Sequence, residues 1–193
     1  AVASPGAAAI LLGTASGSRV TLNSGGTVTS NGGAGAIVAN GDGGFFTING
    51  TVVTNGDYFN PTGTGASVVN LSNNFITTVG STGSITTNGA RTVGLVTRGT
   101  GSSLSVAGSI TANGANSAAI SLIRNGGTTL TNTLTLATDG TALATGATSN
   151  AIFAADAAQI DIAGTARTTG ISPTALNLSN TLSGTVINVA GTG

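Results

Sequence analysis

The chain has 193 residues, of which 32 are Gly, 5% are charged and 3% are aromatic, and its formal net charge is zero. These values exclude an ordinary globule built around large side chains. A hydrophobic content of 39% and a mean hydropathy of +0.37 exclude a disordered, highly charged segment. No clustered positive charge is present for binding nucleic acid, and no Cys is present for disulfides.

A first predicted strand returns along the chain and ends each time at a glycine. The segments are GTVTSNG to Gly32, GTVVTNG to Gly56, GSITTNG to Gly89, GSITANG to Gly114, TLATDG to Gly140 and GTARTTG to Gly170. Successive glycines of this set lie 24 to 33 residues apart. Self-similarity at such a period is typical of solenoids, in which each repeat packs on its neighbours.

Two further predicted strands complete each repeat, and each carries inward residues at positions i and i+2 of one face. The second strand holds Ile10/Leu12, Ile37/Ala39, Val69/Leu71, Leu95/Thr97, Ile120/Leu122, Ile152/Ala154 and Leu176/Leu178. The third holds Val20/Leu22, Phe46/Ile48, Leu104/Val106, Leu130/Asn132, Ile160/Ile162 and Ile187/Val189, and residues 75–79 fill its slot in the third repeat. An alignment of residues 101–114 with 127–140 without a gap sets the register of the fifth repeat.

This three-part order predicts an all-β fold, a right-handed parallel β-helix (β-solenoid) of about seven three-stranded coils. We expect residues 1–193 to form a single domain that is a piece of a longer passenger or stalk. Asn132 is the polar member of an apolar column, so it needs an internal hydrogen-bond partner or a place near a corner. Leu134 stands where other coils have glycine, which predicts a local distortion.

The turn after the first strand repeats one pair of residues in successive coils. The pairs are Asn31-Gly32, Asn55-Gly56, Asn88-Gly89, Asn113-Gly114 and Asp139-Gly140. Asn or Asp followed by Gly best accepts a positive φ, so we expect a sharp corner at each pair. A calcium ladder would need several carboxylates, whereas this column has one. We therefore interpret the column as structural and predict no metal site.

Catalytic chemistry has few residues to use. The chain contains no His, Cys, Lys or Glu, which removes the usual general bases, thiolate nucleophiles and zinc ligands. Its five Asp lie in different coils or columns, and Asp156 and Asp161 are the one close pair. We predict that the chain is not an enzyme, with no catalytic residue and no cofactor.

Two places remain as candidate contact sites. Arg98, Arg124 and Asp156 are expected to lie near one corner of neighbouring coils, either as a solvated ion-pair corner or as a binding patch. The insertion from 55 to 65 carries Asp57, Tyr58, Phe59, Asn60 and Pro61. Such a loop either covers the side of the rod or provides aromatic contact area for recognition.

The segment GSITTNGARTVGLVTRGTGSSLSVAGSITANGANSAAISL, with its G-[ST]-[IV]-x-[TA]-x-G units, resembles the β-helical passenger region of bacterial type V autotransporters. The resemblance implies a cell-surface or secreted location, and export through a C-terminal membrane barrel of the precursor. It also implies an adhesin-like role in adhesion, aggregation or biofilm, with host or neighbouring-cell surface molecules as partners.

Two alternatives stay open. The first and last residues match in register, which favours a subunit that associates with itself head to tail in an extracellular filament. Polysaccharide lyases and hydrolases also use parallel β-helices, so a carbohydrate-active β-helix is the other alternative.

Overall fold

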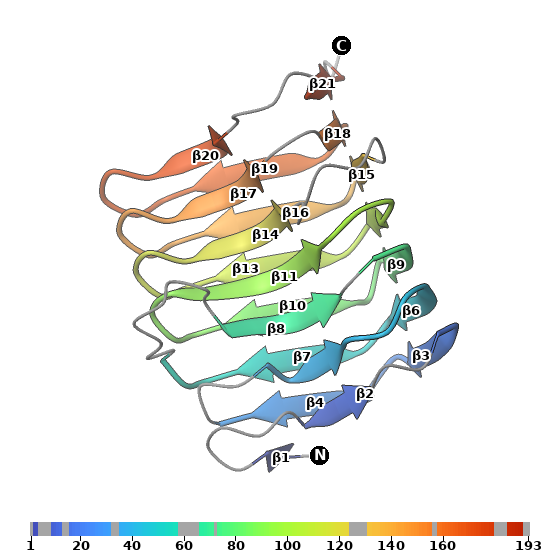
Figure 1. The fold of residues 1–193 in the computed structure, drawn as a ribbon. Coiled ribbons are helices and arrows are strands. Elements are labelled where there is room, and N and C mark those ends of the chain that lie inside the picture. Colours follow the sequence, from blue (N-terminus) through green and yellow to red (C-terminus); the bar gives the residue numbers. More distant parts are fainter. Residues whose placement is uncertain are drawn as a thin grey trace.

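The computed structural model describes residues 2–3, 9–12, 16–31, 35–57, 66–71, 73–123, 131–155, 158–179 and 185–190. These residues form three sheets of seven strands each, and every pair of neighbouring strands is parallel. Within a sheet, each strand lies beside the strand that comes three elements later in the chain. The chain is therefore a parallel β-solenoid, as predicted, with the first and last strands at opposite ends of the stack (Figure 1).

The three sheets each take one strand from every repeat. The first sheet contains β1 (Val2–Ala3), β4 (Thr27–Ser30), β7 (Thr51–Thr54), β10 (Ser84–Thr87), β13 (Ser109–Ala112), β16 (Thr141–Ala144) and β19 (Thr165–Thr168). The second contains β2 (Ile10–Leu12), β5 (Ile37–Ala39), β8 (Ala66–Leu71), β11 (Thr92–Arg98), β14 (Ala118–Ile123), β17 (Asn150–Ala155) and β20 (Thr174–Ser179). The third contains β3 (Ser18–Leu22), β6 (Gly44–Ile48), β9 (Phe75–Val79), β12 (Ser103–Val106), β15 (Asn132–Leu136), β18 (Ala158–Ile162) and β21 (Val186–Val189).

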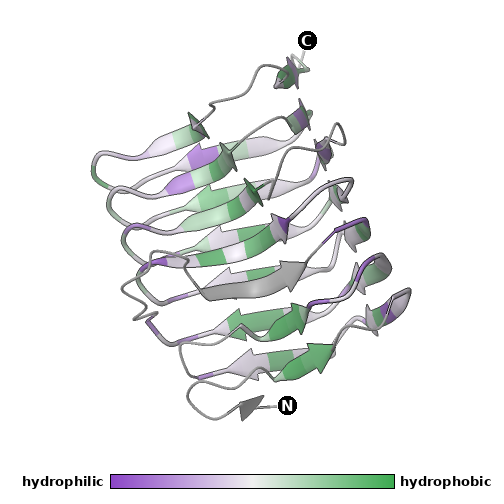
Figure 2. Cartoon of the chain, viewed as in Figure 1, coloured by the Kyte–Doolittle hydropathy of each residue, from purple (hydrophilic) through white to green (hydrophobic). Residues whose placement is uncertain are grey.

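The second sheet has the predicted register in every coil. Ile120 lies opposite Leu95 on one side and Ile152 on the other, and Leu122 lies opposite Thr97 and Ala154. The remaining predicted pairs follow the same two columns. Figure 2 shows apolar residues recurring at matching places on β11, β14 and β17 of this sheet. The i, i+2 rule was sufficient here even at β11, where Thr97 occupies the second position of the pair.

The core is a column of aliphatic side chains enclosed by the three sheets. Ile37, Leu95, Ile110, Ile120 and Leu134 are among its fully buried members. Each such side chain contributes roughly 1.5–3 kcal/mol through burial. Two aromatic rings enter the core from the third sheet, where Phe46 and Phe75 meet edge to face with centroids 5.5 Å apart. Residues 75–79 therefore fill the third-strand slot as predicted, with Val79 opposite Ile48 and Val106.

The predicted register of the fifth coil was wrong. Leu134 lies opposite Leu104 and Ile160, and Leu136 lies opposite Val106 and Ile162. These two leucines, and not the predicted pair Leu130/Asn132, continue the columns of Leu104 and Val106. Strand β16 spans Thr141–Ala144, which moves the first-sheet strand beyond the predicted TLATDG. In the third sheet, a residue and its partner in the previous coil are 134 − 104 = 30 residues apart in the sequence. In the first sheet, the same separation is 141 − 109 = 32 residues. The alignment without gaps assumed 26 residues throughout, so it was already four residues short at β15 and six short at β16. The second-sheet separation is 120 − 95 = 25, so the longer connection between β14 and β15 accounts for most of the error.

The predicted distortion at Leu134 was also wrong, because Leu134 is a regular, fully buried core residue. Asn132 has the internal hydrogen-bond partners that the sequence predicted it would need. It lies at the first position of β15, buried, where its Nδ2 donates to the Gly99 carbonyl at 2.9 Å and its Oδ1 accepts from the Ser102 backbone N–H at 3.0 Å. The amide thus satisfies two backbone groups of the preceding coil's corner.

The corrected register is tested by a matched pair of substitutions, Leu134→Ala and Leu143→Ala. Leu134 faces the core, whereas Leu143 lies on β16 between the buried Ala142 and Ala144 and points outward. Leu134→Ala should lower the free energy of unfolding by about 2–5 kcal/mol because it leaves a cavity. Leu143→Ala should cost no more than about 1 kcal/mol. Urea unfolding followed by circular dichroism measures both, and equal losses would contradict this register.

Candidate functional site

The Asn column is a continuous ladder of side-chain hydrogen bonds along one corner. Asn55 Nδ2 donates to Asn31 Oδ1 at 2.9 Å, Asn88 to Asn55 at 2.7 Å, and Asn113 to Asn88 at 2.8 Å. In the next coil Thr145 takes this place and donates its hydroxyl to Asn113 Oδ1 at 3.0 Å. Asp139-Gly140 was therefore wrongly assigned to the column, since Thr145-Gly146 follows Asn113-Gly114 there.

The glycines of this column are required for a different reason from the one predicted. A Cβ on Gly89, Gly114 or Gly146 would overlap the carbonyl oxygen of the glycine one coil earlier. Positive φ occurs instead two residues after the glycine, at Arg91 (57°), Asn116 (55°), Thr148 (51°) and Ser172 (51°). Gly56 belongs to the same column as the neighbour of Gly89, and Gly32 lies outside the described residues. The column packs coils closely.

The described residues contain no group of three or more His, Cys, Asp or Glu side chains placed to hold a metal ion. The ladder consists of amide groups that bond to one another. Gly140 lies in a different corner, where an added Cβ would overlap the Val106 carbonyl.

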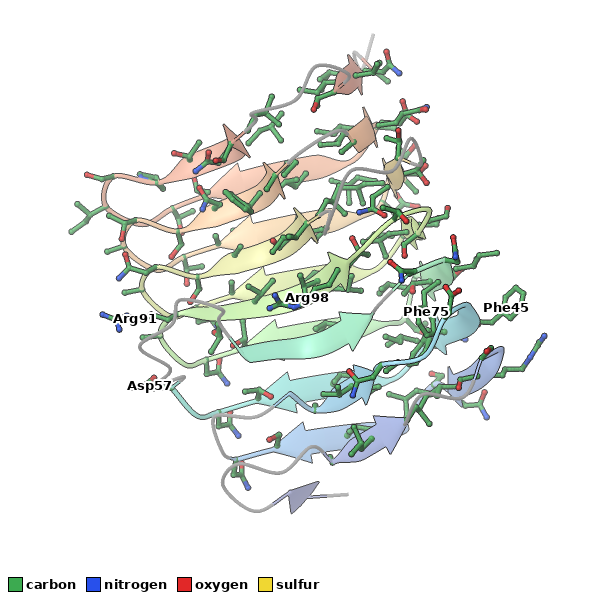
Figure 3. The ribbon with its side chains drawn as sticks, viewed as in Figure 1. Phe45, Asp57, Phe75, Arg91 and Arg98 are labelled. Carbon is green, nitrogen blue, oxygen red and sulfur yellow. The ribbon has the colours of Figure 1, made fainter. Side chains whose placement is uncertain are left out.

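The insertion is described only up to Asp57. The Asp57 carboxylate is exposed and its Oδ1 accepts from the Ala90 backbone N–H at 2.7 Å, so it ties the start of the insertion to the turn of the next coil. Figure 3 shows Asp57 and Arg91 on the same side of the stack. Tyr58, Phe59, Asn60 and Pro61 lie outside the described residues, and their role as a contact loop stays a prediction.

The predicted corner patch is described at Arg98 alone. Arg98 is the last residue of β11, half-buried and opposite Ile123 in β14. Ile123 in turn lies opposite Ala155 in β17. Arg124 and Asp156 are the residues that follow Ile123 and Ala155, and both lie outside the described residues. The patch therefore stays a prediction.

Asp161, the other member of the close Asp pair, occupies an outward position of β18. Its carboxylate accepts from Gln159 Nε2 at 3.1 Å and from Asn188 Nδ2 at 2.6 Å. Both donors are amide groups of the same outer face. The contacts make Asp161 part of a polar ladder between β18 and β21.

One exposed cluster on the outer face of the third sheet was missed from the sequence. Phe45 lies opposite Arg19 on β3 and Ile76 on β9, so the three side chains occupy one outward column of adjacent strands. The Arg19 guanidinium lies over the Phe45 ring, 4.9 Å from its centroid. Phe45 is 43% exposed and Ile76 is 49% exposed. We call Arg19, Phe45 and Ile76 the Phe45 strip.

The alternation of inward and outward residues along the strands could have predicted the Phe45 strip. Phe45 and Phe46 are consecutive in β6, so one ring must point outward when the other fills the core, and the same holds for Phe75 and Ile76 in β9. Figure 3 shows Phe45 projecting from the stack while Phe75 points inward. Hydroxyl groups of the next outward column lie beside the strip, at Thr21, Thr47 and Thr78.

The strip presents a cation, an aromatic face, an aliphatic side chain and neighbouring hydroxyls. This combination suits contact with another molecule rather than proton transfer or nucleophilic attack, which need a base or an activated nucleophile.

Comparison with protein-family models, with curated proteins and with solved structures finds no significant match to this chain. Within the described residues, no helix combines the length and the hydropathy that crossing a bilayer requires.

The Asn ladder gives a graded stability test. Asn88→Ala removes two ladder hydrogen bonds, whereas Asn31→Ala removes one. At roughly 0.5–1.5 kcal/mol net per hydrogen bond, Asn88→Ala should lower the free energy of unfolding about twice as much as Asn31→Ala. Thermal and urea unfolding of both variants measure the difference. A larger loss for Asn31→Ala would contradict the ladder.

Proposed function

We propose that the chain is a non-catalytic surface scaffold that projects from a cell and makes contacts through its side. It would act as a passenger or stalk segment of the type V autotransporter kind, attached at the outer membrane or secreted. We further propose a right-handed winding with seven coils. The three seven-stranded sheets support the number of coils, and the chain path in Figure 1 supports the hand.

The observation that carries the proposal is the Phe45 strip. Large apolar side chains exposed side by side on one face are typical of interaction sites. Here Phe45 and Ile76 lie on neighbouring strands, about 4.8 Å apart in the hydrogen-bonding direction. Their strands are anchored by Phe46 and Phe75 in the core. A partner would therefore meet a contact surface that is already ordered, which lowers the entropic cost of binding.

A second candidate function is the subunit of a self-assembling filament. At the last strands of the stack, residues of the inward columns are exposed: Leu178 is 42% exposed and Val189 is 70% exposed. Their partners one coil earlier, Ala154 and Ile162, are 1% and 9% exposed. A second copy placed with β2 and β3 on β20 and β21 would continue both apolar columns, with Leu12 on Leu178 and Leu22 on Val189.

The scaffold function is tested by displaying the chain on a non-adherent bacterium. Display should increase autoaggregation and retention on host-cell monolayers several-fold over the empty display vector. The double variant Phe45→Ser/Ile76→Ser should return both readings to the vector level. Leu11→Ser is the matched control, because Leu11 is 64% exposed on β2 of the second sheet, away from the strip. Adhesion that is unaffected by the double variant would contradict the proposal.

Electron microscopy and light scattering of the purified chain test the filament candidate. Ordered fibres that are lost in Val189→Asp, which places a charge in the apolar end column, would support it. A monodisperse rod at high protein concentration would count against it.

A further inference from the structure

We propose that the Phe45 strip binds anionic polysaccharide, meaning a sugar chain that carries carboxylate or sulfate groups. This inference rests on the proposed contact function and names the chemical class of the partner. Its three parts are the charge of Arg19, the apolar surface of Phe45 and Ile76, and the hydroxyl column beside them.

Arg19 supplies the charge. In the described part of the chain its guanidinium contacts the Phe45 ring and forms no ion pair with a carboxylate. The Asp42 carboxylate, in the loop before β6, is already hydrogen-bonded by Asn74 Nδ2 at 2.8 Å. A guanidinium is always protonated and presents a planar fork of N–H donors that fits a carboxylate or sulfate group. Arg19 is exposed, and the contact of its guanidinium with the Phe45 ring favours a position over the strip.

Phe45 and Ile76 supply apolar contact. One face of a sugar ring carries mainly C–H groups, which pack on an aromatic ring, while its hydroxyls point to the sides. Thr21, Thr47 and Thr78 form the adjacent outward column on the same three strands, so hydroxyl groups lie beside the strip on every strand. A sugar chain running along the stack would meet one threonine hydroxyl on each of these three strands, at steps of about 4.8 Å.

A peptide is the weaker alternative on this surface. Peptides bind by adding a strand to a free sheet edge, by placing a helix in a groove, or by docking a proline-rich segment in an aromatic groove. Phe45 and Ile76 lie on β6 and β9, which are paired on both sides within the third sheet. Their side chains project from the outer face. Exposed side chains on the outer face of a sheet suit a sugar chain that stacks on them.

Binding is measured on the purified 193-residue protein by biolayer interferometry with three oligosaccharide probes. Oligogalacturonate carries carboxylates, heparin oligosaccharide carries sulfates, and an oligomer of dextran is neutral. We expect one or both anionic probes to bind and the neutral probe to bind at least about tenfold more weakly. Equal binding of all three probes, or binding of none, would overturn the inference.

Substitutions then locate the site. Phe45→Ser should weaken the anionic probe at least about tenfold, as expected for an aromatic contact at the centre of a small site. Arg19→Gln should weaken it similarly and should remove most of its salt dependence, because one charge is lost. Leu11→Ser should leave affinity unchanged. Equal losses in Phe45→Ser and Leu11→Ser would overturn the assignment to the strip. Circular dichroism checks that each variant remains folded.

The two proposals fail in different ways. If cells displaying the chain adhere through the strip but no anionic probe binds, the ligand class is wrong and the contact function stands. If the strip variants leave adhesion unchanged, the contact function itself is wrong. Any shortening of the oligogalacturonate probe during the measurement would show turnover and would overturn binding without catalysis.

Discussion

Stacking of each coil on the previous one in a fixed register is the constraint on which the rest of the structure depends. It makes every inward position a column, so an apolar residue gains its burial only if the coils above and below supply apolar residues at the same place. Ile120 is buried because Leu95 and Ile152 lie on either side of it. The same constraint brings the outward residues Arg19, Phe45 and Ile76 together, although they are far apart in the sequence.

Close stacking also explains the repeated glycines better than backbone conformation does. At Gly114 the carbonyl of Gly89 occupies the space that a side chain would need. The left-handed backbone that the turn requires is adopted two residues later, by Asn116 and by its equivalents in other coils. Sequence reasoning assigned only the positive φ to the Asn-Gly pair, because such a pair adopts that conformation readily, and it did not predict the close packing. Only the packing of neighbouring coils separates the two roles.

The sequence predicted the parallel solenoid and the columns of the second sheet because six of those seven strands offer an apolar pair at i and i+2, and Leu95/Thr97 keeps the same spacing. The predicted register of the fifth coil was wrong because four residues of one parity could each face inward: Leu130, Asn132, Leu134 and Leu136. Alternation therefore predicts which face is inward, but it does not predict which two of these residues align with the core pair of the previous coil. Corner length resolves that ambiguity, and it depends on contacts between coils. The Phe45 strip could have been predicted from two consecutive aromatic residues in one strand. The predicted contact loop and most of the corner patch lie outside the described residues.

The Asn ladder has a direction. Each amide from Asn55 to Asn113 donates toward the coil before it and accepts from the coil after it. The side-chain dipoles are therefore aligned head to tail along one edge, and neighbouring hydrogen bonds polarise one another. A stack of nearly identical coils thus acquires a chemical polarity that its apolar interior lacks.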